Sequence, residues 1–456
     1  MALDLGSWQA RLDALAREHR VPGAALAVLH DGEVAEAATG VLNVETGVEA
    51  TPDSLFQIGS ITKPYTATLA MQLVDEGAVV LDRPIAAALP ELRLADPDAT
   101  GRITLRHLLS HSSGIQGDHF VDVGRGDDVL ARYVESCATL GLSHPVGATM
   151  SYCNTGYVIV GRLVEHLTGK TWDEALRERL LEPLGLAHTV TLPEEAMRFR
   201  VAYGHEVEAR KDARLVSTWT LPRALGPAGQ ICATAADTLA FARLHLDGGR
   251  APDGARVLSE EAAGAMRDPQ IAIPDPWTLG SHWGLGWILF DWDGRRVFGH
   301  DGATMGQVAF LRVVPEDGVA IALLTNGGNA HDLYEALFGE LLAALCDLRM
   351  PRRLEPPADP PAVDVRELAG RYERVGRQIV LEAYGDGSLR GRLAYTGLLA
   401  ELDDDSEQDF TLVPVAERVF ATRFGDERTW TPAVFYKLPD GSPYLHMGAR
   451  ATPKVA

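Results

Sequence analysis

Cysteine is scarce in this chain, and no two cysteines are neighbours. Four occur among the 456 residues, none within a Cys-x-x-Cys pair: Cys137, Cys153, Cys232 and Cys346. A disulfide framework or a thiolate metal site needs cysteines at short, regular spacings. His107 and His111 stand four residues apart, yet the glutamate of His-Glu-x-x-His is missing. We therefore expect reduced cysteines, no metal site and no cofactor.

Long apolar runs and positive charge are also in short supply. No uninterrupted apolar stretch approaches the ~20 residues of a membrane-spanning helix, and residues 1–8 lack the basic and apolar segments of a secretory signal. Lys and Arg number 42 against 63 Asp and Glu, which gives a formal net charge of −21. Nucleic acids and anionic membranes attract proteins with a concentrated positive face. We expect a cytoplasmic protein that binds neither.

The hydrophobic pattern predicts a mixed α/β catalytic domain over residues 1–350. Alternating apolar runs predict strands near both ends of this region, and helical periodicity dominates between residues 82 and 290. We expect the early and late strands to share one sheet, with a helical subdomain inserted between them. The predicted strands cover residues 24–30, 34–38, 287–290, 308–314 and 319–325.

A second domain is predicted after a proline-rich stretch. Residues 351–361 contain two Pro-Pro pairs and no periodicity, which is typical of a linker. Residues 362–456 then show short strand-like runs at intervals of about 8–12 residues. This spacing is typical of a small antiparallel β-barrel.

The strongest chemical pattern is Ser60-Ile61-Thr62-Lys63, at the start of a predicted buried helix. One helical turn separates Ser60 from Lys63, so the hydroxyl and the amine share a face. A serine hydroxyl is a weak nucleophile, and an amine whose pKa is lowered in a dry pocket can accept its proton. We predict that Ser60 is the nucleophile and Lys63 the base.

Two further segments supply the other groups that an acyl-transfer site needs. Tyr152 and Asn154 stand two residues apart, so in an extended stretch they project from the same side. The phenol near two cations would lose its proton more easily and relay it to the leaving group. The Asn154 carboxamide would bind an amide on the acyl side of the substrate.

The segment Gly299-His300-Asp301-Gly302-Ala303 lies before a predicted strand. We expect His300 to be the third polar group over the pocket, with Asp301, Gly302 and Ala303 beside the substrate. The backbone amides of Ser60 and Ala303 would form the oxyanion hole.

Taken in order, Ser-x-x-Lys, Tyr-x-Asn and His-x-Gly resemble the motifs of the serine β-lactamase and penicillin-binding-protein superfamily. The segment Leu108-Leu109-Ser110-His111-Ser112-Ser113-Gly114 between the first two strengthens the likeness to its class C β-lactamase-like branch. This branch includes DD-peptidases, D-aminopeptidases and esterases. Many members carry Lys-Thr-Gly where this chain has His300-Asp301-Gly302, which argues against β-lactamase activity.

The His-Asp-Gly variant followed by a lipocalin-like barrel resembles the penicillin-binding-protein-type thioesterases. Those enzymes release nonribosomal peptides from a carrier protein by head-to-tail cyclisation, joining a D-configured C-terminal residue to an L-configured N-terminus. The resemblance implies a peptidyl ester on Ser60, a peptidyl thioester or ester substrate, a peptidyl carrier protein as partner, and Arg450 reaching the pocket from the barrel. Two alternatives stay open: a D-stereospecific esterase, aminopeptidase or peptidase that uses water as acceptor, and a penicillin sensor without turnover.

Overall fold

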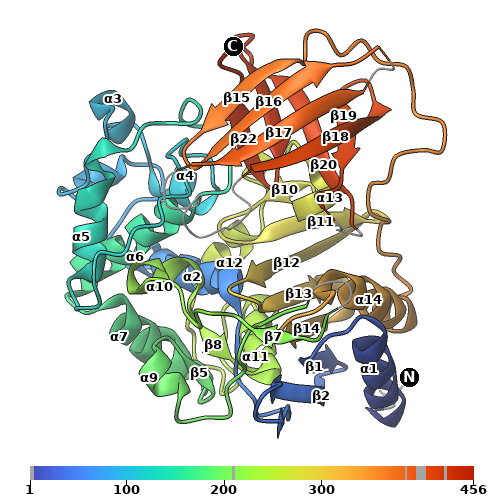
Figure 1. The fold of residues 1–456 in the computed structure, drawn as a ribbon. Helices are drawn as coiled ribbons and strands as arrows, with labels where there is room; N and C mark the ends of the chain where they lie inside the picture. The colour runs from blue at the N-terminus through green and yellow to red at the C-terminus, as the bar shows by residue number, and fades with distance from the viewer. Residues whose placement is uncertain (1–4, 208–210, 386–387, 397–406, 426–428) are drawn as a thin grey trace.

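The computed structural model describes residues 5–207, 211–385, 388–396, 407–425 and 429–456. A large sheet with helices on both faces occupies the lower part of the molecule in Figure 1, and an all-β unit lies above strands β10 and β11. The mixed α/β fold with a helical part and a C-terminal barrel, which the sequence predicts, is confirmed.

The catalytic part is built on a nine-stranded sheet in which neighbouring strands pair antiparallel. In sheet order the strands are β3 (Val48–Glu49), β2 (Glu33–Asn43), β1 (Gly23–His30), β14 (Val319–Thr325), β13 (Val308–Val314), β12 (Arg295–Ala303), β11 (Ile288–Trp292), β10 (His282–Trp283) and β9 (Ile271–Ala272). Early strand β1 therefore pairs with late strand β14, as the sequence predicts.

Both faces of this sheet are covered, so alternate residues of one strand enter different cores. Ala25, Ala27 and Leu29 of β1 pack with α2 (Thr62–Asp75) and α11 (Ala235–Leu246). Ala24, Leu26 and Val28 pack with α1 (Leu5–Glu18) and α14 (Ala330–Cys346) on the opposite face. A strand buried on both sides reads as a continuous apolar run, which is why this strand is readable from the sequence.

The helical subdomain lies between β4 and β9 and surrounds α2 (Figure 1). Its helices are α3 (Pro97–Thr100), α4 (Leu105–Leu109), α5 (Val129–Ser136), α6 (Asn154–Thr168), α7 (Trp172–Leu176), α8 (Glu182–Leu184), α9 (Pro193–Ala196), α10 (Gly226–Gly229), α12 (Glu260–Met266) and, after β9, α13 (Pro276–Leu279). Its short strands are β4 (Phe56–Gln57), β5 (Thr189–Val190), β6 (His205–Glu206), β7 (Arg214–Leu215) and β8 (Cys232–Ala233).

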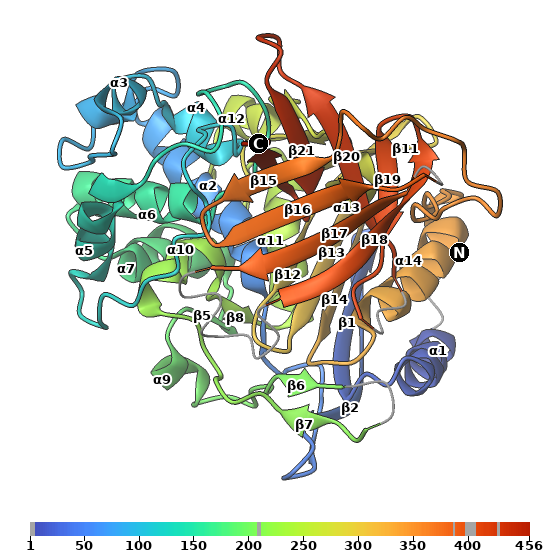
Figure 2. The ribbon, with the colours of Figure 1, turned by 45° about the horizontal axis from the view of Figure 1, so that its top comes forward.

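The C-terminal unit is an eight-stranded antiparallel meander in sequence order, seen from outside in Figure 2. Its strands are β15 (Gly370–Arg374), β16 (Arg377–Ala383), β17 (Leu389–Tyr395), β18 (Glu407–Ala416), β19 (Val419–Thr422), β20 (Thr431–Lys437), β21 (Pro443–Met447) and β22 (Arg450–Pro453). A bridge between Tyr372 and Lys454 joins the first strand to the end of the last, which closes the barrel around its own apolar core.

One strand was not predicted. The segment from Gly299 to Ala303 lies before strand β13, as the sequence predicts, but it also forms the end of strand β12, which pairs with β13. Its glycines hide the strand pattern, because glycine has low strand propensity. Since side chains alternate along a strand, His300 and Asp301 face opposite sides of the sheet.

The structure also describes the cysteines and the apolar character of the helices. All four cysteines are free and buried, as expected. Within the described ranges, no helix is long and apolar enough to cross a bilayer.

Helix α6 packs closely against α10 at Gly161. A Cβ atom added at Gly161 would collide with the Pro227 ring and lie 2.7 Å from its Cβ atom. The contact matters for the active site because the residue after Pro227 in α10 supplies a carbonyl to Lys63. Gly339 in α14, by contrast, has open space around its Cβ position.

We predict opposite effects for alanine at these two helical glycines. Gly161→Ala overpacks the α6–α10 contact and should lower the free energy of unfolding by about 1–3 kcal/mol. Gly339→Ala should raise it by ~0.5–1 kcal/mol, because alanine loses less backbone freedom in a helix. Denaturant unfolding of both variants checks this; equal effects would show that α10 does not press on α6.

Candidate active site

The structure brings Ser60 and Lys63 together at the centre of the catalytic part. Ser60 lies in a 3₁₀ turn, Gly59–Ile61, that runs directly into α2. The Lys63 Nζ atom lies 3.0 Å from Ser60 Oγ and donates a hydrogen bond of 2.7 Å to the Ala228 carbonyl of α10. The serine and the amine are thus in direct contact, and the carbonyl fixes where the amine points.

Lys63 is held in the state that a base needs. Its side chain is fully buried. Burial, and second the positive charge of Arg450, hold the pKa of the Lys63 amine well below its ordinary value. An uncharged amine has a free lone pair, so Lys63 can take the proton of Ser60.

Tyr152 lies against this pair. The Lys63 Nζ atom is 4.7 Å from the centroid of the Tyr152 ring, and the phenol is hydrogen-bonded to Ser60. Burial raises the pKa of the Tyr152 phenol above its ordinary value, and the Ser60 hydrogen bond and the Arg450 charge only partly oppose this. The Arg450 charge does favour loss of the phenol proton, as expected of a nearby cation, but burial outweighs it, so the phenol stays protonated in the free protein. A protonated phenol can instead donate to a leaving group.

His300 faces the same cluster from strand β12. Its Nδ1 atom donates to the Asp301 carbonyl oxygen at 2.6 Å, which leaves Nε2 as an acceptor. Burial lowers the pKa of His300 to about 3. The imidazole is therefore neutral at physiological pH, and the third motif contributes an acceptor and no positive charge.

Asp301 points elsewhere. Its carboxylate forms a two-pronged ion pair with the Arg312 guanidinium of β13, at 2.5 and 3.1 Å. Arg312 is buried and also lies over the rings of Phe290 and Tyr334. The structure thus separates the Asp301 side chain from the Ser60 cluster, because adjacent residues of a strand face opposite sides.

The segments that carry the backbone amides of Ser60 and Ala303, the predicted oxyanion-hole donors, approach each other closely. The end of β12 approaches the 3₁₀ turn so closely that a Cβ atom at Gly302 would collide with the Ile58 carbonyl and lie 2.9 Å from Ser60 N. A Cβ atom at Gly59 would lie 2.6 Å from Ala303 N. Only glycine permits this approach at both positions, which brings the two amides close to the nucleophile.

Asn154 begins helix α6, immediately after the extended residues Tyr152 and Cys153. Its backbone amide donates to the Gly117 carbonyl at 3.1 Å, and the residue is half-buried. Tyr152 and Asn154 therefore belong to one short segment, and its start is anchored to the loop that follows Gly114.

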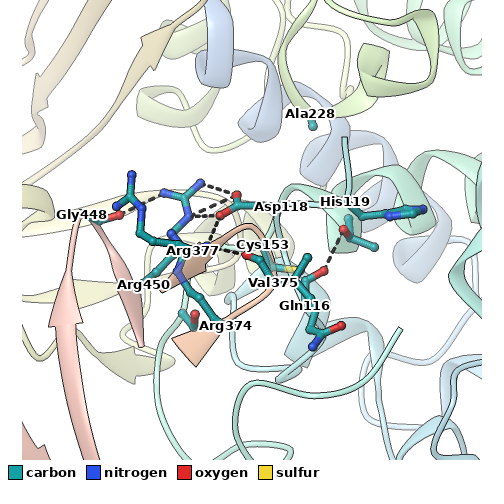
Figure 3. Close-up of polar contacts among 12 residues, drawn as sticks. Gln116, Asp118, His119, Cys153, Ala228, Arg374, Val375, Arg377, Gly448 and Arg450 are labelled. Atoms are coloured by element: carbon teal, nitrogen blue, oxygen red, sulfur yellow. Dashed lines mark hydrogen bonds and ion pairs between the residues drawn. The ribbon is translucent and has the colours of Figure 1, made fainter. Parts of the chain in front are cut away.

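Arg450 reaches this segment from the barrel, as Figure 3 shows. Its guanidinium carbon lies 5.1 Å from the Tyr152 ring centroid, and its nitrogens bind the Asp118 carboxylate at 2.7 and 2.9 Å. Arg374 of β15 binds the same carboxylate at 2.5 Å. The two guanidinium groups hold the pKa of Asp118 at about 2, so this buried cluster carries one negative and two positive charges at neutral pH.

Several residues of the site carry no sequence signal. Ala228 acts through its backbone carbonyl, which no side-chain pattern reveals. Asp118 and Arg374 come from a loop and a barrel strand that meet only in the folded chain. His111, assigned only a structural role from the sequence, packs its ring 4.3 Å from that of Tyr152; the surrounding Leu-Leu-Ser-His-Ser-Ser-Gly segment is the one signal that could have found it.

Together these groups can carry out acyl transfer. A nucleophilic hydroxyl, a neutral amine, a protonated phenol and two backbone amides converge on one point, as covalent catalysis at a carbonyl requires. Among the described residues no cluster of three or more His, Cys, Asp or Glu side chains is arranged to hold a metal ion.

Comparison with known proteins agrees with this geometry. The family described as Beta-lactamase matches residues 8–344. Penicillin-binding protein 4 of Amycolatopsis lactamdurans is 53% identical over 378 residues, which cover 82% of this chain and 99% of that protein.

Solved structures extend the likeness to the barrel. A crystal structure of SurE with D-Leu superposes with a TM-score of 0.79 at 30% identity and covers 100% of both chains. The D-amino acid amidase of Ochrobactrum anthropi, in complex with L-phenylalanine amide, superposes with a TM-score of 0.63 at 25% identity over 75% of this chain and 99% of that one. The chain therefore belongs to the beta-lactamase family of serine hydrolases and acyltransferases, in the penicillin-binding-protein superfamily.

Proposed function

We propose that this protein is a peptide cyclase: a thioesterase that transfers a peptidyl chain to Ser60 and releases it as a head-to-tail macrocycle. The observation that carries the proposal is the contact of Ser60 with a buried neutral amine and a protonated phenol, in a site that Arg450 of the barrel completes. The D-Leu bound in SurE has the configuration that the thioesterase resemblance implies for the C-terminal residue of the substrate.

Acylation follows from the positions of the three side chains. Ser60 Oγ attacks the thioester carbonyl while Lys63 accepts its proton, and the amides of Ser60 and Ala303 stabilise the oxyanion. When the tetrahedral intermediate collapses, the carbon–sulfur bond breaks. The leaving thiolate takes the Tyr152 proton, and the Lys63 ammonium returns a proton to the phenolate.

Release uses the same amine as base. The N-terminal amine of the same peptide attacks the Ser60 ester, forms the new amide bond and loses its proton to Lys63. The Lys63 ammonium then gives a proton to Ser60 Oγ as the ester bond breaks. His300 Nε2 and the Asn154 carboxamide hold the peptide during both steps. A peptidyl carrier protein delivers the thioester. β-Lactamase turnover is not expected, since the neutral His300 offers no cation where many relatives have lysine.

A cavity of about 670 Å³ between the two domains offers room for the rest of the acyl chain. Its walls are mixed, with Gln116 and Phe120 from the catalytic part and Val375, Thr396 and Val455 from the barrel. This volume lies in the range of small-molecule binding sites. Asp118 belongs both to the cavity wall and to the ion pair with Arg450, so this ion pair links the cavity to the Tyr152 ring, against which Arg450 lies.

A second function is favoured by one observation. The structural likeness to a D-amino acid amidase supports a D-stereospecific hydrolase in which water resolves the Ser60 ester. The two functions share acylation and differ in the acceptor.

The nucleophile can be tested by intact mass. With an activated peptidyl ester, we predict a covalent adduct on the wild-type protein and none on Ser60→Ala, with a loss of turnover of at least about 10⁴-fold. Ser217→Ala, which changes an exposed loop serine, should behave as the wild type. A peptidyl adduct on the Ser60→Ala protein would contradict the scheme, and a wild-type adduct that never turns over would point to a sensor.

The acceptor can be read from the product mass. With a linear peptidyl thioester ending in a D-residue, we predict a macrocycle that is one water, about 18 Da, lighter than the free acid, because the amine outcompetes water for the acyl-enzyme. The matched substrate with an L-residue at that position should react far more slowly. Free acid as the sole product would establish the D-specific hydrolase instead.

The cavity can be tested by filling it. Val375→Trp places an indole at the cavity wall, so KM for a peptidyl thioester should rise by about tenfold or more, a penalty of about 1.4 kcal/mol, while a p-nitrophenyl acetate assay stays near the wild-type value. Val380→Trp is the control, because Val380 is as exposed as Val375, at 37% against 36%, but does not line the cavity. Equal KM values for the two variants would exclude the cavity from substrate binding.

A further inference from the structure

The main chain around Tyr152 is held from two sides. On the catalytic side, the Ser151 amide donates to the His111 carbonyl at 2.9 Å and the Cys153 amide donates to His111 Nδ1 at 3.0 Å. On the barrel side, the Tyr152 amide itself donates to the Ala449 carbonyl at 2.9 Å. Three consecutive amides are therefore fixed by two residues that are remote from each other in the sequence.

On the barrel side, the contact with Tyr152 is made by a tight turn. Gly448 and Ala449, which link β21 to β22, both have positive φ, at 58° and 65°. Two consecutive residues with positive φ form the turn that matches the twist of a two-residue hairpin. The Ala451 amide, just past the turn, donates to Ser151 Oγ at 3.2 Å. The hairpin therefore runs along the residues that flank the catalytic tyrosine.

Arg450 adds a side-chain contact to these main-chain ones. Its guanidinium lies against the Tyr152 ring while Asp118 holds it by hydrogen bonds to two of its nitrogens. A third nitrogen donates to the Gly448 carbonyl at 3.0 Å. A guanidinium fixed on three sides has one available position, so the tyrosine ring packs against a rigid surface.

We propose that the β21–β22 hairpin positions Tyr152 for proton transfer, with Ala449 fixing its main chain and Arg450, held by Asp118, fixing its ring. The inference rests on the proposed acyl transfer at Ser60 and assigns the barrel a part in the chemistry. Arg450 is thus a positioning residue, whether or not it also touches substrate.

The position of Arg450 has an electrostatic consequence for Lys63. Besides its hydrogen-bond partners Ser60 and Ala228, Lys63 interacts with several titratable or charged side chains. They are Tyr152, Tyr157, Cys153, His111, His300, Asp118 and Arg450. Both histidines are neutral, because burial lowers their pKa values. After burial, the positive charge of Arg450 lowers the pKa of Lys63. Removing it should therefore raise the pKa of Lys63.

The test compares two arginines that bind the same carboxylate. We expect Arg450→Gln in the full chain to lower kcat for a p-nitrophenyl ester by about 10- to 100-fold, as displacement of a proton-transfer group does. The acidic limb of its pH–rate profile should move to higher pH, because Lys63 is protonated sooner as the pH falls. Arg374→Gln removes the neighbouring guanidinium and should leave that limb at its wild-type position.

A third variant separates charge from geometry. Arg450→Lys keeps the positive charge but loses the two-pronged contact with Asp118, so its acidic limb should stay near the wild-type pH while kcat falls. Thermal unfolding of each variant confirms that it is folded. A shared shift in Arg450→Gln and Arg374→Gln, or a change in KM alone, would overturn the proposal. A wild-type protein that forms no Ser60 adduct would instead overturn the proposed function.

Discussion

The burial of the Lys63 amine is the constraint on which the rest of the site depends. A lysine with no exposed surface is costly unless it is neutral or paired, and among the described residues no carboxylate forms an ion pair with it. Helices α6 and α10 pack against α2, strand β12 packs against the 3₁₀ turn that carries Ser60, and the barrel contacts Tyr152. The fold therefore leaves this amine no exposed surface. The same burial keeps Tyr152 protonated and both nearby histidines neutral. Burial in one pocket therefore determines the protonation states of Lys63, Tyr152 and the two histidines.

The contact between the catalytic part and the barrel depends on a buried ion cluster. Asp118 is buried between Arg450 and Arg374, and a buried ion cluster contributes little net stability yet becomes strongly unfavourable when one partner is lost. Such a cluster specifies geometry more than it adds affinity. It locks β15 and β22 against the loop of the catalytic part, and this holds the hairpin that contacts Tyr152. The barrel and the catalytic part are thus joined, next to the active site, by the ion cluster of Asp118, Arg374 and Arg450.

Much of this architecture can be predicted from the sequence because its signals are local. The run from Ala24 to Leu29 is apolar on both faces, and Ser60 and Lys63 lie one helical turn apart, so strand, helix and motif are all readable. The strand character of His300 and Asp301 is not, since the two glycines of this segment, Gly299 and Gly302, mask it. The roles of Asp118, Ala228 and Arg374 cannot be predicted from the sequence either. Each acts through a backbone carbonyl or an ion pair that forms only when distant segments meet.

The contacts of the β21–β22 hairpin with Tyr152 also determine when, during synthesis, the active site is complete. Segments emerge from the ribosome in sequence order, and domains fold as units, N-terminal first. The nucleophile, the amine and the phenol are all made long before residues 448–451, whose hairpin grips the phenol's own peptide. A nascent chain that has folded only its catalytic part carries every reacting atom but does not yet have the hairpin contacts on Tyr152, so on the role proposed for the hairpin it gains full reactivity only when its last residues have folded.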